Sequence, residues 1–244
     1  MFIQIAGKSC WRIILNRRIK CDVKIYKYLA TEYAERLVNK GEMLFRSLSY
    51  FRDLEDGGVR QDEFEGTLRH RPKGGLIITK ENGEQVSLPH RFESMAKEES
   101  IFVYCFSTEL DPSLARTFGA DACVEIADPI KLLAKVKSAI RLRSAVKEKL
   151  VPAGLVRYYE DHDPPIVDWA LPEKIAMAKR ARYSSQHEYR IAFAEGDAFT
   201  VENVQIQLVD ENAERPARNS AHSERLLKLG DLSKFCAIHR FEHT

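Results

Sequence analysis

The chain has 244 residues, of which 44% are hydrophobic and 30% are charged. A chain of this length and composition can build a full core in one large domain or two small ones, which excludes disordered and collagen-like proteins. The 38 Lys and Arg residues against 36 Asp and Glu residues leave a net charge of +2, so the chain lacks the strong positive charge of a dedicated nucleic-acid binder.

The five cysteines are odd in number and widely scattered, without any Cys-x-x-Cys spacing. This pattern argues against a disulfide framework and a zinc cluster, and it predicts reduced thiols in a cytoplasmic protein. No stretch approaches the roughly 20 apolar residues of a membrane span, so we expect no membrane contact. Lys8 and Arg12 interrupt the apolar runs of residues 1–23, and we interpret this segment as an N-terminal extension that fits a signal peptide badly.

The first elements of the domain follow this extension. Residues 24–29 are rich in β-forming side chains and predict a strand. Thr31 has the character of an N-cap for a helix over residues 32–39, and Gly41 that of its C-cap. A second strand is expected at residues 42–48.

An exposed β-rich excursion is expected over residues 67–100, where the dipeptide Asn82-Gly83 predicts a hairpin turn. The apolar run at residues 101–106 has the length of a buried strand, and residues 122–126 are its expected partner. Residues 130–148 carry apolar side chains at helical spacing and many Lys and Arg side chains between them. This pattern predicts an amphipathic helix with a basic outer face.

The remaining predicted elements are one helix and several short strands. The helix is predicted over residues 169–181, beginning near Pro172. The strands are predicted at residues 157–159, 189–194, 199–201, 204–208, 226–232 and 235–238. These elements together predict a single α+β domain over residues 24–244. We expect a mostly antiparallel sheet, split into two packed halves, with the helices 32–39 and 130–148 on its flanks.

Residues 53–66 form a strongly acidic loop. Its carboxylates are those of Asp53, Glu55, Asp56, Asp62, Glu63 and Glu65. Oxygen ligands of this kind suit Mg²⁺ or Ca²⁺, so a metal-dependent nuclease is one interpretation of the loop. The interpretation that we favour assigns no metal, because neighbouring arginines can neutralise the charge. Arg46 or Arg52 should then pair with one of these carboxylates, and Phe51 and Phe64 should anchor the loop to the core.

The tripeptide Gln186-His187-Glu188 stands where a polar segment turns into the apolar strand at residues 189–194. A carboxylate at the mouth of a strand can hold a ribose hydroxyl group and stabilise an oxocarbenium-like transition state. On an extended strand, His187 would point away from both Gln186 and Glu188. Gln186 and Glu188 are therefore the candidate catalytic residues, and His187 has at most a supporting role.

Several short motifs resemble the ADP-ribosyltransferase superfamily in the same order along the chain. They are Ile25-Tyr26-Lys27-Tyr28, Phe106-Ser107-Thr108 and Glu188-Tyr189. The resemblance implies transfer of ADP-ribose from NAD to an unknown macromolecule, protein or nucleic acid, in a bacterial toxin or antiviral-defence setting. It implies that Glu188 stabilises the oxocarbenium ion and that Gln186 orients the acceptor. The residues that it implies for NAD binding are Tyr26, Lys27, Ser107 and Phe118.

Three positions depart from the pattern of that superfamily. Lys27 stands where His or Arg is usual, Glu109 replaces the third residue of a Ser-Thr-Ser motif, and Phe118 replaces the stacking Tyr. A lysine can bind a diphosphate as a point charge, but it lacks the bidentate geometry of arginine. These departures leave open a second hypothesis, in which the chain is a non-enzymatic module that binds a nucleotide or a partner.

A closer resemblance, over about residues 24–195, is to an uncharacterised bacterial family known only as a domain of unknown function. It is carried by Tyr26-Lys27-Tyr28, by the loop from Phe51-Arg52-Asp53 to Glu65-Gly66, by Cys105-Phe106-Ser107 and by Glu188-Tyr189-Arg190. This resemblance implies no activity. The transferase hypothesis depends on one geometric expectation, which is that Lys27 and Glu188 border the same cleft.

Overall fold

The computed structural model describes residues 23–54, 61–210 and 222–241. Its largest element is an eight-stranded sheet with the order β14-β2-β7-β1-β8-β15, to which β12 adds beside β7 and β9 adds beside β12. All strand pairs in this sheet are antiparallel. The strands are β1 (Ile25–Leu29), β2 (Glu42–Ser47), β7 (Ile101–Ser107), β8 (Ala122–Ile126), β9 (Ala153–Leu155), β12 (Glu188–Ala194), β14 (Glu224–Lys228) and β15 (Cys236–Arg240).

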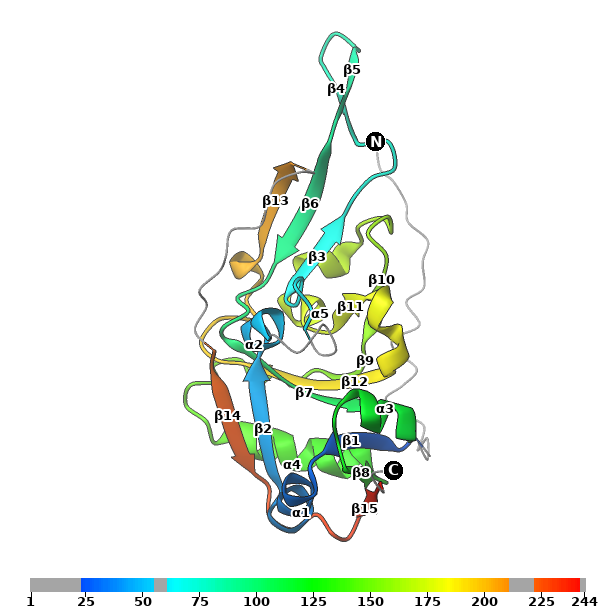
Figure 1. The fold of residues 1–244 in the computed structure, drawn as a ribbon. Helices are drawn as coiled ribbons and strands as arrows, with labels where there is room; N and C mark the ends of the chain where they lie inside the picture. The colour runs from blue at the N-terminus through cyan, green and yellow to red at the C-terminus, as the bar shows by residue number, and fades with distance from the viewer. Residues whose placement is uncertain (1–22, 55–60, 211–221, 242–244) are drawn as a thin grey trace.

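Strand β7 has three partners, and their arrangement splits the sheet. Strand β12 pairs with β7 along its whole length. On the opposite edge, β2 pairs with Phe102 and Val103, whereas β1 pairs at Ser107. Residues 104–106 of β7 therefore pair with β12 but with neither β1 nor β2 in the described chain. Figure 1 shows β1, β8 and β15 on one side of this split and β2 and β14 on the other.

Two helices cover one face of the sheet and bury its main core. They are α1 (Thr31–Lys40) and α4 (Pro129–Arg141). Leu37 of α1 and Val136 of α4 are fully buried in one cluster with Phe45, Phe102 and Phe193 from the strands. Burying one such side chain contributes about 1.5–3 kcal/mol, so this cluster is a main source of the fold's stability.

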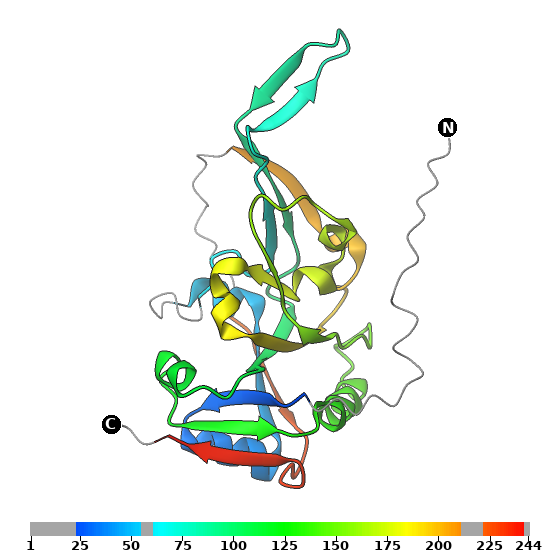
Figure 2. The same ribbon diagram turned by 90° about the vertical axis from the view of Figure 1, so that its right-hand side faces the viewer.

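A smaller sheet lies beyond the main sheet, and a hairpin projects from it (Figures 1 and 2). The sheet has the order β13-β6-β3, and the hairpin joins β4 to β5. Gly83 has φ 83° at the hairpin turn, which confirms the predicted Asn82-Gly83 turn. A separate parallel pair joins β10 to β11. These strands are β3 (Thr67–His70), β4 (Leu76–Thr79), β5 (Gln85–Leu88), β6 (His90–Met95), β10 (Arg157–Tyr159), β11 (Ala178–Arg180) and β13 (Gln205–Asp210).

Short helices connect the strands. They are α2 (Leu48–Asp53), α3 (Pro112–Thr117) and α5 (Pro172–Ile175), with the 3-10 helices η2 (Val167–Ala170), η3 (Ala181–Gln186) and η4 (Val201–Asn203). Among the described residues, none of the helices has both the length and the apolar character needed to cross a membrane.

The α+β class and the mostly antiparallel sheet are confirmed, but some predicted details are wrong. The strand at residues 122–126 pairs with β1 and β15, not with β7, because β1 lies between them. Thr31 begins α1, whose N-cap is Ala30. The predicted excursion over residues 67–100 is exposed at the hairpin, whereas β3 and β6 bury Leu68 and Met95.

Two predicted helices are shorter than expected. Helix α4 ends at Arg141, and the following turn buries Val146, which bridges to Gly196. The helix expected over residues 169–181 is interrupted after Ile175, because residues 178–180 pair with β10 as strand β11. In both places a tertiary contact outweighs the local helical pattern.

Gly41 gives a first testable prediction, because both its backbone conformation and its close neighbour require a residue without Cβ. It has φ 62°, and an added Cβ would lie 2.4 Å from the carbonyl oxygen of Gly230. For Gly41→Ala we expect a backbone cost of about 1–2 kcal/mol and a further cost of about 1–3 kcal/mol from the overlap. Gly119→Ala is the matched control, because Gly119 has φ 61° and no atom within 4 Å of the added Cβ. Equal losses of unfolding free energy in urea would contradict the proposed clash.

Candidate functional site

A cavity of about 720 Å³ opens beside the split in the sheet, and we call it the inner cleft. Its walls come from β1, β2, β7, β12 and β14 and from the helices α1 and α2. All six residues for which the transferase resemblance implies a role lie in these walls. They are Tyr26, Lys27, Ser107, Phe118, Gln186 and Glu188. Lys27 and Glu188 therefore border the same cavity, as the transferase hypothesis requires.

The sheet register explains how residues from distant segments meet. Ser107 lies opposite Tyr26 on one side and opposite Glu188 on the other. Residues directly opposite each other in antiparallel strands project from the same face of a sheet. Tyr26, Ser107 and Glu188 therefore form a row across β1, β7 and β12 on one face.

Lys27 fills the split between β1 and β2. Its Nζ donates a hydrogen bond of 2.8 Å to the carbonyl oxygen of Cys105 and lies 4.4 Å from the centroid of the Tyr104 ring. This carbonyl belongs to the part of β7 that pairs with neither β1 nor β2, and a buried carbonyl group needs a donor. The ammonium group thus takes the place of a strand hydrogen bond and sets a positive charge in the wall of the inner cleft.

Arg190 is the centre of a buried ion network behind Glu188. Its Nε donates to Glu188, and its two terminal nitrogens donate to the carboxylate oxygens of Glu65 at 2.6 and 2.9 Å. The carbonyl oxygen of Ala176 and the second oxygen of Glu188 accept the remaining N–H groups at 2.8 and 3.4 Å. All five N–H donors of the guanidinium group are therefore used. Arg190 is 1% exposed and Glu65 also 1%, so water contributes little to this network.

Lys179 is the second cation of the network. Its Nζ lies 3.3 Å from the Oε2 atom of Glu188 and donates a 2.9 Å hydrogen bond to the side-chain oxygen of Gln186. Burial would lower the pKa of Lys179, but Glu188 and Glu65 outweigh it and raise that pKa, so the amine stays charged. The network thus brings two carboxylate groups and two cationic groups together.

Glu188 is held as a carboxylate by these neighbours. Burial alone would raise its pKa, but the charges of Arg190 and Lys179 outweigh burial and hold the pKa well below its usual value. Its backbone N–H donates a 2.9 Å hydrogen bond to the hydroxyl group of Tyr158, which fixes the start of β12. The inner cleft therefore has an ionised, positioned carboxylate in its wall at neutral pH.

Lys179, Glu65 and Arg190 are the members of this network whose roles the sequence did not reveal. Lys179 fell inside the helix predicted over residues 169–181, and strand β11 positions it instead. Glu65 was a candidate of the acidic loop, but its carboxylate binds Arg190. The only sequence signal that linked these segments was the resemblance to the uncharacterised bacterial family, which included both Glu65-Gly66 and Glu188-Tyr189-Arg190.

Three described carboxylates of the acidic loop, those of Asp53, Glu63 and Glu65, pair with different arginines. Asp53 binds Arg52 at 2.7 Å, and Glu63 lies 3.2 Å from Arg182. The pair of Arg52 and Asp53 confirms the predicted neutralisation by arginine. Within the described ranges, no group of three or more His, Cys, Asp or Glu side chains is arranged to hold a metal ion.

The other expectations for the acidic loop have mixed outcomes. Phe64 is 7% exposed and Phe51 packs against a second core cluster, which confirms that both side chains anchor the loop. Asp62 is buried, and its carboxylate accepts a 3.1 Å hydrogen bond from the backbone N–H of Phe64. Glu55 and Asp56 lie outside the described residues.

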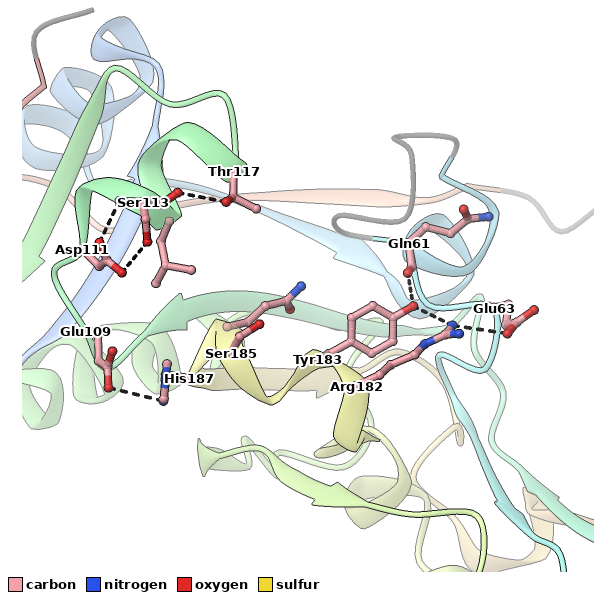
Figure 3. Close-up of a pocket in the computed structure, with 12 residues that line it drawn as sticks. Gln61, Glu63, Glu109, Asp111, Ser113, Thr117, Arg182, Tyr183, Ser185 and His187 are labelled. Carbon is pink, nitrogen blue, oxygen red and sulfur yellow. Dashed lines mark hydrogen bonds and ion pairs between the residues drawn. The ribbon is translucent and has the colours of Figure 1, made fainter. Parts of the chain in front are cut away.

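A second cavity of about 780 Å³ lies next to the inner cleft, and we call it the outer pocket. Gln186 lines both cavities. Figure 3 shows the outer pocket between α3, which carries Ser113 and Thr117, and η3, which carries Tyr183 and Ser185. Its lining is mostly polar, so it suits a hydrogen-bonding ligand more than an apolar one.

His187 adopts a conformation that the sequence did not predict. It is the C-cap of η3 in the left-handed region, with φ 45° and ψ 49°, so it is not part of an extended strand. This region costs a non-glycine residue about 1–3 kcal/mol and is found preferentially at functional sites. The imidazole Nδ1 lies 3.4 Å from the Oε1 atom of Glu109, and both side chains line the outer pocket.

Fold and site together define an α+β protein with a split antiparallel sheet and a cleft that contains a buried, ionised carboxylate. Comparison of the chain with models of protein families, with curated proteins and with solved structures finds no match. A functional hypothesis for this protein therefore has to come from the residues of the cleft and from the motifs they carry.

Proposed function

We propose that the protein binds NAD in the inner cleft and transfers ADP-ribose to an acceptor, with an ADP-ribosyltransferase-like arrangement of the split sheet. The observation that carries this proposal is the convergence of six residues from four separate segments on one cavity. Their motifs resemble the ADP-ribosyltransferase superfamily.

The chemistry of the cleft supports this proposal. Cleavage of the bond between ribose and nicotinamide develops positive charge on the ribose, and an ionised carboxylate nearby stabilises it. Arg190 and Lys179 keep Glu188 ionised, and its second oxygen has only long contacts of 3.3 and 3.4 Å with them. Each of these contacts uses a lone pair of that oxygen, so a ribose hydroxyl group would bind there by displacing the longer one. Lys27 supplies a point charge for the diphosphate.

Turnover of labelled NAD by the full chain tests the proposal. We expect release of nicotinamide, and transfer of labelled ADP-ribose to a component of a cell lysate or to nucleic acid. NAD at 100 times its Kd should also stabilise the fold by about 2.7 kcal/mol in a thermal-shift titration. A chain that neither releases nicotinamide nor gains stability from NAD would contradict the proposal. The macromolecular acceptor, the cytoplasmic location and the toxin or defence setting stay predictions.

One observation favours a second candidate, a nucleotide-binding module without catalysis. Both oxygens of Glu188 already contact cations, which offsets part of the negative charge that would stabilise an oxocarbenium ion. Stabilisation by NAD without nicotinamide release would favour this module. The nuclease hypothesis gains no support from the described residues, because Asp53, Glu63 and Glu65 each bind a different arginine.

A further inference from the structure

We propose that the outer pocket receives the nucleophile of the reaction and that His187, oriented by Glu109, is its general base. This inference rests on the proposed function, because it assigns the second substrate of the same reaction. Figure 3 shows the pair of side chains at one end of the outer pocket. An extended strand would limit His187 to a supporting role, but its backbone is left-handed and not extended.

The two cavities meet at the residues that would carry the reaction. Gln186 lines both the inner cleft and the outer pocket, His187 lines the outer pocket, and Glu188 lines the inner cleft. Of these three consecutive residues, His187 therefore borders one cavity, Glu188 the other, and Gln186 both. An NAD molecule held beside Glu188 and a nucleophile held beside His187 would approach each other at Gln186.

The backbone of His187 is anchored to the end of β7. Its carbonyl oxygen accepts a 2.8 Å hydrogen bond from the backbone N–H of Thr108, and the hydroxyl group of Thr108 donates a second one of 3.3 Å. Glu109, which follows Thr108, contacts the imidazole Nδ1 at 3.4 Å. One short segment thus holds both the backbone and the ring of His187.

His187 and Glu109 are arranged as a general base and the carboxylate that orients it. A carboxylate at Nδ1 favours the tautomer with its proton on Nδ1 and leaves Nε2 as an acceptor. His187 is 45% exposed and Glu109 is 51% exposed, so the ring can reach a ligand in the pocket. The separation of 3.4 Å is a contact rather than a formed hydrogen bond. Catalytic hydrogen bonds are often long without a ligand and tighten in the substrate complex.

The lining of the outer pocket indicates the class of nucleophile. The hydroxyl groups of Ser113 and Thr117 donate to Asp111 and to the carbonyl oxygen of Ser113, and their oxygens can accept a hydrogen bond from a ligand. Ser185 adds a third hydroxyl group to the lining. A general base serves a nucleophile that must lose a proton, and among such nucleophiles an alcohol or water matches the hydroxyl groups of this lining. We therefore assign the pocket to a hydroxyl-bearing acceptor, with water as the simplest member of the class.

The reaction balances with the groups at hand. The bond between the ribose C1′ and the nicotinamide nitrogen breaks, and its electron pair goes to the ring nitrogen, so nicotinamide leaves as a neutral molecule. An oxygen of the acceptor forms a bond to C1′. Its proton moves to Nε2 of His187, and the imidazolium ion is stabilised by Glu109 until the proton passes to solvent.

His187→Asn in the full chain tests this role, with water as the acceptor. Asparagine tolerates the left-handed region, so the variant should keep the backbone and lose the base. We expect nicotinamide release from NAD to fall on the order of 10²-fold, with unchanged NAD affinity and partial recovery when imidazole is added. His162→Asn is the matched control, because His162 is exposed and its ring contacts the carbonyl oxygen of Arg71, away from both cavities. It should keep the wild-type rate.

Each outcome of this experiment has a distinct meaning. A wild-type chain that releases no nicotinamide would contradict the proposed function and the role of His187 with it. An active wild type with an equally active His187→Asn variant would overturn the general base alone. A slow variant that imidazole does not recover, together with weakened NAD binding, would show that His187 only supports the fold of the cleft, and would also overturn the role.

Discussion

Replacing Glu188 with Gln is expected to lower the rate of nicotinamide release on the order of 10²–10³-fold, as for the loss of one essential electrostatic contact. Glutamine keeps the size of the side chain and one oxygen, but it removes the negative charge that, in the proposed reaction, faces the developing oxocarbenium ion. The affinity for NAD should change much less than the rate, because the charge matters most in the transition state. Steady-state rates and equilibrium binding of NAD measure the two effects separately.

Glu65→Gln is the matched control for this variant. It removes the same charge from the same partner, Arg190, but Glu65 does not line the inner cleft. If Glu188 acts on the substrate, the Glu65 variant should lose stability and keep most of its rate per folded molecule. Equal losses of rate in both variants would show that the buried network, and not the carboxylate in the cleft, limits the reaction.

The second large effect is expected for stability, in Arg190→Met. Methionine fills much of the same space but leaves the carboxylates of Glu65 and Glu188 without their principal partner. Breaking one partner out of a buried ion network typically costs about 3–5 kcal/mol. Urea unfolding at neutral pH measures the loss. The control is Arg225→Met, because Arg225 binds Glu195 at 2.6 Å while 33% exposed, and partly exposed pairs contribute about 1 kcal/mol or less.

The pH dependence of Arg190→Met provides an independent test. In the wild type the pKa of Glu188 lies below its value in the unfolded chain. The stability that ionised Glu188 contributes to the fold is therefore fully present above a pH of about 4.3 and is lost as the pH falls further. In the variant, burial acts with less opposition and should raise that pKa. Protonation of Glu188 in the variant then removes the buried charge. The difference in unfolding free energy between wild type and variant should therefore shrink from pH 7 toward pH 4. A difference that grows on acidification would contradict this account of the network.

Much of the fold could be predicted from local patterns. The apolar run of β7 and the alternation in β12 identify buried strands, because strand side chains alternate between faces with a period of two. Gly41 marks the end of α1, because only a residue without Cβ reaches φ 62° cheaply there. The motif residues of the inner cleft could also be named in advance, because their motifs resemble those of the ADP-ribosyltransferase superfamily.

The sequence by itself determined most of the segments that form strands and helices, among them β1, α1, β7 and β12, and it named six residues that line the inner cleft. It did not determine that β1 separates β7 from β8, that β11 replaces a predicted helix or that Glu65 meets Arg190. Each strand or charged side chain could pair with many distant segments, and the most stable combination forms. A local sequence pattern does not specify which distant segment that partner is. Only the tertiary structure decided that Lys27 fills a split in the sheet and that His187 turns out of the strand toward Glu109.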